Sequence, residues 1–167
     1  MKLQVLVGMI ASGKSSYARN AANHGVVSVN DDAIVSMLHA GKHTLYSKSL
    51  KPLYKAIENA VASTALAMRL TVIIDRGVNV SVNSRKRWTA IARSLDAECE
   101  ALVFPKQFAH THAERRFASD PRGQTLEDWL AVADRHHAEY QEPTKEEGFS
   151  EIRMISLQDI QRFTVYL

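Results

Sequence analysis

The sequence predicts an α/β fold, with a central, mostly parallel sheet of five strands flanked by helices. Short apolar runs alternate with longer segments of helical character along the whole chain. The runs are nearly continuous in apolar residues, which is typical of strands buried on both faces of a parallel sheet. The chain has 167 residues, 46% hydrophobic and 23% charged, so we expect a single domain over residues 1–167 with a full hydrophobic core.

Strands and helices are expected to alternate three times in the first half of the chain. The expected strands cover residues 2–7, 26–29 and 70–75, and the expected helices cover residues 14–23, 30–40 and 50–69, with a polar connection at 41–49. Gly25 has the usual stop position after the first helix. Pro52 is tolerated in the first turn of the third helix. The third strand is rich in β-branched residues and is the clearest strand in the sequence.

The second half of the chain continues the alternation. The expected strands cover residues 98–104 and 152–155, and the expected helices cover residues 84–95, 108–118, 126–141 and, briefly, 157–163. Pro105 ends the fourth strand, and Thr125 is the expected N-cap of the helix that starts at residue 126. Cys99 is the only cysteine and falls inside a strand, so we expect a buried thiol and a reducing, cytoplasmic environment.

Charge and hydropathy set limits on the class of protein. The net charge of +3 and the pI near 9.1 permit an anionic substrate without identifying one. No apolar run has the length of a membrane span, and the chain reaches a strand at once, so we expect neither a membrane anchor nor a signal peptide. The histidine pairs His110-x-His112 and His136-His137 lack partners at zinc-ligand spacing, which makes a metal site there a poor prediction.

A phosphate-binding loop is predicted at residues 8–15, which read G-x-x-x-x-G-K-S directly after the first strand. Glycines allow backbone N–H groups to approach an anion closely, and the following helix adds the positive end of its dipole. Lys14 is expected to bind the β- and γ-phosphates of ATP or another nucleoside triphosphate, and the Ser15 hydroxyl to bind Mg²⁺. The residues expected to bind the nucleotide in this segment are Gly8, Ile10, Ala11, Ser12, Gly13, Lys14, Ser15 and Ser16.

Three carboxylates follow strands whose carboxyl ends should meet at the edge that carries this loop. An ionised Asp31 beside the γ-phosphate would accept a proton from an attacking hydroxyl, with Asp32 as the second candidate. The alternative for either residue is to cap the helix that begins there. Asp75 is placed to help bind Mg²⁺, or else it pairs with Arg76 in a turn.

A polar loop over about residues 118–125 is expected to act as a lid. Arg122 lies in this loop between Pro121 and Gly123, and closure would bring its guanidinium to the transferring phosphate. The alternative is a solvated surface arginine. Arg115 or Arg116 on the preceding helix offers a second cation for the same phosphates.

The segment Arg85-Lys86-Arg87-Trp88 places three cations and an aromatic ring within about a turn and a half of helix. It is compatible with a groove for a nucleic-acid backbone that includes a stacking ring. More often, such a run is a solvated helix face that contributes one tryptophan to the core.

At Gly8–Ser15, Asp31-Asp32, Asp75 and Arg122 together, the chain resembles the kinase domain of phage polynucleotide kinase. The resemblance extends over about residues 2–140 and implies transfer of the ATP γ-phosphate to the 5′-hydroxyl of DNA or RNA. It implies that Lys14 and Ser15 hold the phosphates and Mg²⁺, that Asp31 is the general base and that Arg122 is the lid arginine.

The chain departs from this family on the acceptor side. An arginine three residues after the base usually contacts the substrate's 3′-phosphate, and here that position is Ile34. The usual Asp-Thr-Asn reads Asp75-Arg76-Gly77, so Arg76 is a candidate for the missing charge. Asp32, Arg76 and Arg85 are therefore the expected substrate contacts.

Two other functions remain open at this stage. One is a kinase of a nucleoside, a hydroxylated DNA base or another small metabolite, and the other is a nucleotide-gated binding module. The sequence does not indicate an oligomeric state.

Overall fold

The structure is a computed structural model that describes residues 1–119, 123–156, 158 and 159. The short helix expected over residues 157–163 lies largely outside the described residues. Arg122 and the centre of the expected lid lie outside them altogether. Among the helices that are described, none is long and apolar enough to cross a membrane.

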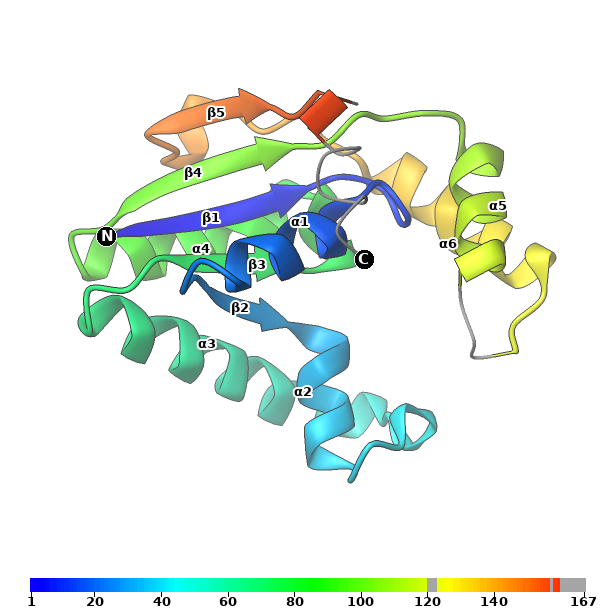
Figure 1. Cartoon of the computed structure of the whole chain (residues 1–167), viewed down its shortest axis with the longest axis horizontal. Coiled ribbons are helices and arrows are strands. Elements are labelled where there is room, and N and C mark those ends of the chain that lie inside the picture. Colours follow the sequence, from blue (N-terminus) through cyan, green and yellow to red (C-terminus); the bar gives the residue numbers. More distant parts are fainter. Residues whose placement is uncertain (120–122, 157, 160–167) are drawn as a thin grey trace.

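Five parallel strands form the predicted central sheet (Figure 1). They are β1 (Lys2–Val7), β2 (Val27–Asn30), β3 (Val72–Asp75), β4 (Glu98–Val103) and β5 (Glu151–Met154), in the order β2-β3-β1-β4-β5. Val5 of β1 is in register with Ile74 of β3 and Ala101 of β4. Because the strands are parallel, their carboxyl ends meet at one edge of the sheet, and this edge positions the site.

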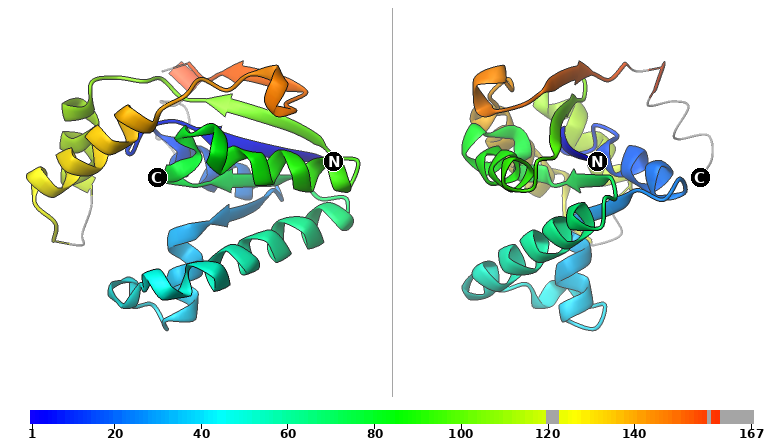
Figure 2. Two further views of the ribbon diagram at one scale, coloured as in Figure 1. Left: turned by 180° about the vertical axis from the view of Figure 1, so that it is seen from behind. Right: turned by 90° about the vertical axis from the view of Figure 1, so that its left-hand side faces the viewer.

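Helices cover both faces of the sheet and its carboxyl edge (Figures 1 and 2). Their bounds are α1 (Lys14–Ala22), α2 (Asp31–Leu38), α3 (Lys51–Ala67), α4 (Val82–Ser94), α5 (Ala109–Ser119) and α6 (Leu126–Glu139). Short 3₁₀ turns are η1 (His43–Leu45), η2 (Lys48–Leu50), η3 (Gly77–Val80) and η4 (Lys145–Glu147). Figure 2 shows α1 on one face of the sheet and α3 and α4 on the other. The hairpin of α5 and α6 lies beyond the carboxyl edge.

The alternation of side chains along the strands builds a core on each face. Leu3, Val5 and Val7 of β1 are buried with Trp88 of α4. The intervening Leu6 is buried on the opposite face, with Ala18 of α1. The near-continuous apolar runs in the sequence are therefore explained by a sheet that is covered on both sides.

The local structure corrects one prediction about capping. Asn30, and neither Asp31 nor Asp32, caps α2, because its side chain accepts a hydrogen bond from the Ala33 amide at 2.8 Å. Both carboxylates instead lie in the first turn of α2, where their negative charge interacts favourably with the positive end of the helix dipole. Thr125 is the N-cap of α6 as predicted, and it forms a reciprocal capping box with Asp128.

The Arg85–Trp88 segment contributes Trp88 to the core and exposes Lys86, as expected for a solvated helix face with one core tryptophan, but Arg85 has neither of its expected roles. Arg85 is fully buried, and its guanidinium binds both carboxylate oxygens of Glu147 at 2.8 and 2.6 Å. The same guanidinium donates to the carbonyls of Asn79, Val80 and Gln141. Arg85 therefore joins α4 to the segment after α6 and is not available to a substrate, which corrects the expected substrate contact. Trp88 is fully buried and so cannot stack on a base.

We predict that Arg85→Met destabilises the protein by about 3–5 kcal/mol, because it leaves the Glu147 carboxylate without its cation. Lys86→Met, at the exposed next position of the same helix, is the matched control and should change the stability by less than about 0.5 kcal/mol. Urea unfolding followed by circular dichroism measures both values. Equal stability of the two variants would contradict a structural role for Arg85.

Candidate functional site

The phosphate-binding loop connects β1 to α1 at the carboxyl edge of the sheet (Figure 1). Gly13 and Ala11 have positive φ angles of 96° and 48°, a conformation that turns successive backbone N–H groups toward a common centre. Gly8 has no room for a side chain, since a Cβ atom there would lie 2.7 Å from Ser12 Oγ and 2.9 Å from Phe104 Cβ. The loop thus has the cradle geometry that binds phosphates.

Lys14 is buried inside this loop. Its ammonium donates to the carbonyl oxygens of Gly8 at 2.9 Å and Met9 at 2.5 Å and to Ser12 Oγ at 3.3 Å. Burial lowers the pKa of Lys14 from 10.5 to about 8, although the negative charges of Asp75 and Asp31 act to raise it. A desolvated cation held by neutral oxygens has an unmet preference for an anion, which a polyphosphate would satisfy.

Ser15 and Asp75, the two residues expected to bind Mg²⁺, both lie at the carboxyl edge of the sheet. Ser15 is exposed in the first turn of α1, which holds no acidic residue to compete with a phosphate. Asp75 ends β3 and is 4% exposed. A hydroxyl and a carboxylate are hard oxygen ligands, so the donor set fits a Mg²⁺ ion with a bound phosphate.

Asn30 links the carboxyl ends of β2 and β3, a contact that the sequence analysis missed. Its amide nitrogen donates to the backbone carbonyl of Asp75 at 3.1 Å and to Asp75 Oδ2 at 3.0 Å. One side chain therefore caps α2 and orients Asp75. The signal in the sequence is an asparagine between a strand and two aspartates, a pattern that by itself indicates only the start of a helix.

Asp31 lies next to Arg76 at the start of α2. Arg76 Nε is 3.4 Å from Asp31 Oδ2 and 3.2 Å from Glu58 Oε1, so Arg76 pairs with these two carboxylates and not, as one alternative had it, with Asp75. Desolvation raises the pKa of Asp31 from 3.8 to about 6, although the charge of Arg76 opposes the rise. The Asp31 side chain is 31% exposed, so it can still receive a ligand. Asp32 beside it is exposed.

Glu58 is a further charged residue of the site that the sequence analysis missed. It is 1% exposed in the middle of α3 and contacts Arg76 on one side and Arg87 on the other. Arg87 in turn lies 4.0 Å over the ring of Trp88. A signal was available, because Glu58 falls between Tyr54 and Ala62 at four-residue spacing, on the face of α3 that enters the core.

Two buried histidines lie on the α5–α6 side of the loop. Desolvation lowers the pKa of His112 and of His136 to about 4, and the charge of Lys14 adds to both shifts. His112 Nε2 accepts a hydrogen bond from the Gln107 amide at 3.1 Å, and the ring of His136 faces Gly77. Both imidazoles are therefore neutral at physiological pH. Within the residues that the structure describes, no cluster of three or more potential metal ligands occurs.

Comparison with known proteins assigns this architecture to a family. A family model described as an AAA domain matches residues 3–139. The chain belongs to this family. Residues 3–139 of this AAA domain include the phosphate-binding loop, Asp31, Asp75 and the α5–α6 hairpin. No curated protein matches the chain in sequence.

Solved structures similar to this AAA domain include kinases. A chain in a structure of a Pnkp1/Rnl/Hen1 complex is 25% identical with a TM-score of 0.59, over 74% of this chain and 43% of that one. This chain therefore spans less than half the length of that relative. A putative kinase from Chloroflexus aurantiacus has a TM-score of 0.65 at 14% identity, over 99% of this chain and 98% of that one. A gluconokinase from Sinorhizobium meliloti has a TM-score of 0.57 at 18% identity, over 99% and 90%.

These likenesses confirm the predicted P-loop kinase fold and the predicted resemblance. They do not select an acceptor, because the proteins with this fold include a gluconokinase. The predicted site residues of the described chain do gather at one edge of the sheet: the loop, Asp31, Asp75 and Arg76. Arg85 does not join them.

We predict that Lys14→Met raises the stability of the nucleotide-free protein at pH 7 by about 1–3 kcal/mol, because it removes a desolvated charge. Lys14 has a lower pKa folded than unfolded, so the unfolded chain binds more protons between pH 8 and 10.5 and wild-type stability rises with pH in that window. The advantage of the variant should therefore shrink over the same window. Urea unfolding at several pH values measures it, and Lys86→Met is the exposed control. A variant less stable than wild type at pH 7 would contradict this account.

Proposed function

We propose that the protein is an ATP-dependent phosphotransferase that moves the γ-phosphate to a hydroxyl, most specifically the 5′-hydroxyl of DNA or RNA. The observation that carries this proposal is the position of Asp31, a carboxylate within electrostatic reach of Lys14 in the phosphate-binding loop. A plain nucleotide-binding module does not require a base at that position. A kinase requires one to orient and deprotonate the attacking hydroxyl.

Each group of the site has a role in this reaction. The loop amides and Lys14 hold the polyphosphate, and Ser15 and Asp75 would hold a Mg²⁺ ion, which neutralises charge on the phosphates when bound. Asp31 accepts the proton of the acceptor hydroxyl while the oxygen of that hydroxyl forms a bond to the γ-phosphorus. The bond between the γ-phosphorus and the bridging oxygen breaks, and ADP leaves. Arg122, which lies outside the described residues, is proposed to complete the charge stabilisation from the lid.

The acceptor side offers a second candidate. Ile34 is buried at 8% exposure, so this position of α2 contributes to the core and cannot bind an acceptor phosphate. Arg76, the candidate replacement, already faces Asp31 and Glu58. These two observations favour a small acceptor such as a nucleoside, a hydroxylated base or another metabolite. The mildly basic charge and the relative in the Pnkp1/Rnl/Hen1 complex favour a polynucleotide.

We propose a reducing, cytoplasmic compartment for this activity, because the single cysteine leaves no internal disulfide to form. Cys99 is a free, buried thiol, and burial raises its pKa to about 12, so it is unreactive.

Asp31→Asn is predicted to lower phosphate transfer by about 10²–10⁴-fold and to leave ATP affinity within about a factor of three, because only proton acceptance is lost. The assay uses γ-labelled ATP with a panel of 5′-hydroxyl oligonucleotides, nucleosides and sugars. Asp32→Asn, one position further on the same helix, tests the second candidate base, and we expect it to retain transfer. Labelling of nucleosides alone would replace the polynucleotide by the small acceptor, and wild-type turnover by Asp31→Asn would remove Asp31 from the mechanism.

The pH dependence of transfer should also report Asp31. Its pKa of about 6 means that the carboxyl is increasingly protonated below that pH and can no longer accept a proton. We expect kcat/KM to fall about tenfold per pH unit below about pH 6 and to be level just above it. A pH profile at limiting substrate tests this, and Asp32→Asn should move the inflection to lower pH, because the charge of Asp32 contributes to the raised pKa of Asp31. An inflection near pH 4 would contradict the raised pKa.

A further inference from the structure

One stretch of the chain carries all of its excess positive charge. Residues 33–57 contain four lysines and no aspartate or glutamate. The other 142 residues hold 17 lysines and arginines against 18 carboxylates, so without this stretch the chain would be slightly acidic. Such segregation is typical of a surface that binds an anion larger than a single phosphate.

The four lysines are exposed, two on the connection between α2 and α3 and two at the start of α3. Lys42 precedes η1, Lys48 begins η2, and Lys51 and Lys55 lie one turn apart in α3. Each of the four is exposed, and no carboxylate of the same stretch is present to neutralise it. The connection therefore presents a sequence of cations that leads away from the start of α2.

An ordered aromatic ring lies among these lysines. Tyr46 stacks on Tyr54 with ring centroids 5.6 Å apart and an interplanar angle of 27°, and Tyr46 is 41% exposed. Tyr54 is itself buried and fixed, because its hydroxyl lies 2.9 Å from His39 Nε2 and accepts from the Ser47 amide at 3.2 Å. One face of Tyr46 is thus held in place while part of the ring remains open to a ligand.

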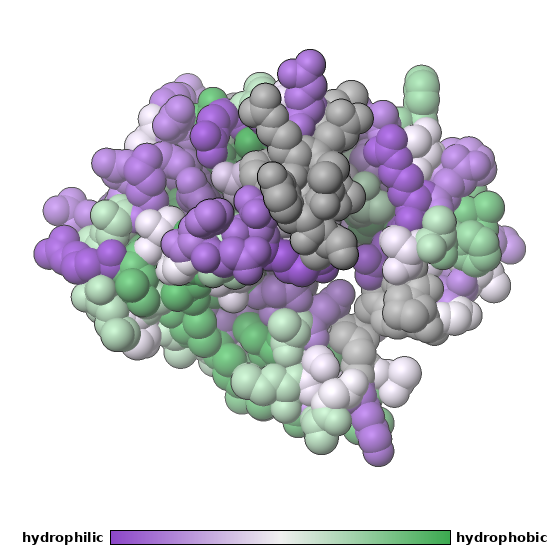
Figure 3. All heavy atoms as spheres, viewed as in Figure 1, coloured by the Kyte–Doolittle hydropathy of each residue, from purple (hydrophilic) through white to green (hydrophobic). Residues whose placement is uncertain are grey.

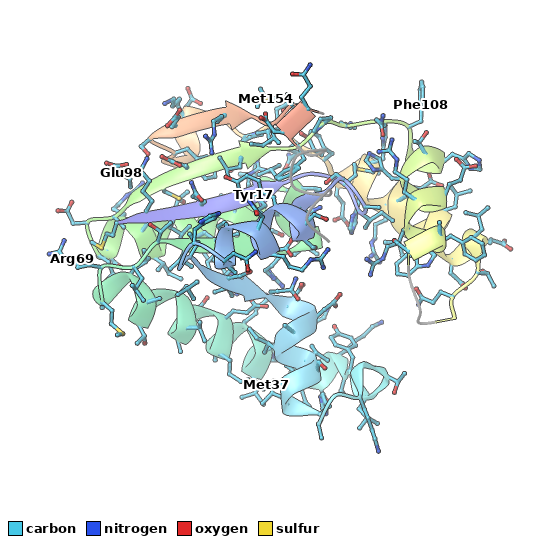
Figure 4. All side chains as sticks on the ribbon, viewed as in Figure 1. Tyr17, Met37, Arg69, Glu98, Phe108 and Met154 are labelled. Atoms are coloured by element: carbon cyan, nitrogen blue, oxygen red, sulfur yellow. The ribbon has the colours of Figure 1, made fainter. Side chains whose placement is uncertain are left out.

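Apolar side chains surround this ring at the surface. The exposed ones are Met37 and Leu38 at the end of α2, Leu45 in η1 and Leu53 in α3. Figure 3 shows apolar side chains gathered over this part of the molecule, and Figure 4 shows Met37 pointing outward from it. Such a surface is complementary to a single-stranded nucleic acid, because the cations can bind its phosphates and the exposed ring and apolar side chains can contact its unpaired bases.

We propose that the connection between α2 and α3, with Tyr46 and the lysines 42, 48, 51 and 55, binds a single-stranded polynucleotide. Tyr46 stacks on a base, and the lysines follow the backbone phosphates. The claim that the bound strand is the phosphate acceptor rests on the proposed function. The claim that this surface binds a single strand does not.

The surface has a geometric relation to the site. α2 begins at Asp31 and carries the chain about 12 Å to its other end, where η1 contacts it. A strand whose 5′-hydroxyl lies at Asp31 would therefore reach Tyr46 with one of its first few nucleotides. Contacts of this kind to the strand beyond its end would replace the contact that Ile34 does not make.

Direct binding tests the proposal without reference to catalysis. The probe is a fluorescent 5′-hydroxyl oligonucleotide of about 12 nucleotides, single-stranded, titrated with the full chain in the absence of ATP. We expect Tyr46→Leu, which keeps the packing on Tyr54, to weaken binding at least about fivefold. Lys48→Gln combined with Lys51→Gln should weaken it and reduce the slope of log affinity against log salt by about 1.4.

Matched controls lie elsewhere on the surface. Phe108→Leu removes an aromatic ring that is 83% exposed at the other side of the molecule, and Arg69→Gln with Arg93→Gln removes two exposed charges at other positions (Figure 4). Both should bind the oligonucleotide within about a factor of two of wild type. Circular dichroism and thermal unfolding of every variant separate lost binding from lost folding.

The outcomes separate this inference from the proposed function. Loss of binding in Tyr46→Leu and in the lysine variant, with the controls intact, supports the surface even if no acceptor is phosphorylated. In the transfer assay, the same variants should raise KM for the oligonucleotide and leave kcat and KM for a nucleoside 3′-phosphate unchanged. Failure of wild type to bind the oligonucleotide, or equal losses in controls and variants, overturns the proposal and leaves the apolar side chains for a protein partner.

Discussion

The acceptor side of the site depends on how one buried carboxylate is neutralised. Glu58 is 1% exposed within α3, where an unpaired charge would cost several kcal/mol. Arg76, from the turn after β3, and Arg87, from α4, supply the two cations. Three elements are therefore held together by this network, and the position of Arg76 beside Asp31 follows from it. The environment of the proposed base is thus determined by helix packing as much as by the loop that contains it.

The donor side is organised by the strand ends. Asn79 donates from its amide nitrogen to the carbonyls of Leu6 and Ile74 at 3.2 Å each, so one buried side chain ties β1 and β3 where they reach the site. Phe104 at the end of β4 closes over Gly8, and Asn30 at the end of β2 orients Asp75. The parallel order of the sheet brings these ends to a single edge. The strand ends around the loop are consequently held by Asn79, Phe104 and Asn30, none of which is part of the sequence motif that identifies the loop.

The sequence predicted the features that depend on local patterns. Continuous apolar runs predicted the five strands, and the G-x-x-x-x-G-K-S pattern predicted the loop and Lys14, since both signals are contained within a few consecutive residues. The roles of Glu58 and Arg85 could not be predicted in the same way. Each is a charged residue on a helix, and only the tertiary contacts with Arg76 or Glu147, contributed by remote segments, make burial possible. The capping role of Asn30 was missed because two adjacent aspartates offered the same local chemistry.

Several charged groups around the site are poorly solvated when no ligand is bound. Lys14 is desolvated among neutral oxygens, Asp31 has a raised pKa, and the histidines nearest the loop are neutral. The buried charges of Lys14 and Asp31 destabilise the folded protein, since either group would be better solvated in water. A polyphosphate beside Lys14 and a hydroxyl beside Asp31 would offset the desolvation cost of these two groups. Their burial therefore favours the bound state. The lysines after α2 differ in kind, because they remain solvated and attract a ligand at longer range. In this proposal, the exposed lysines would attract a single-stranded polynucleotide, and the buried charges of the site would then position its 5′ end.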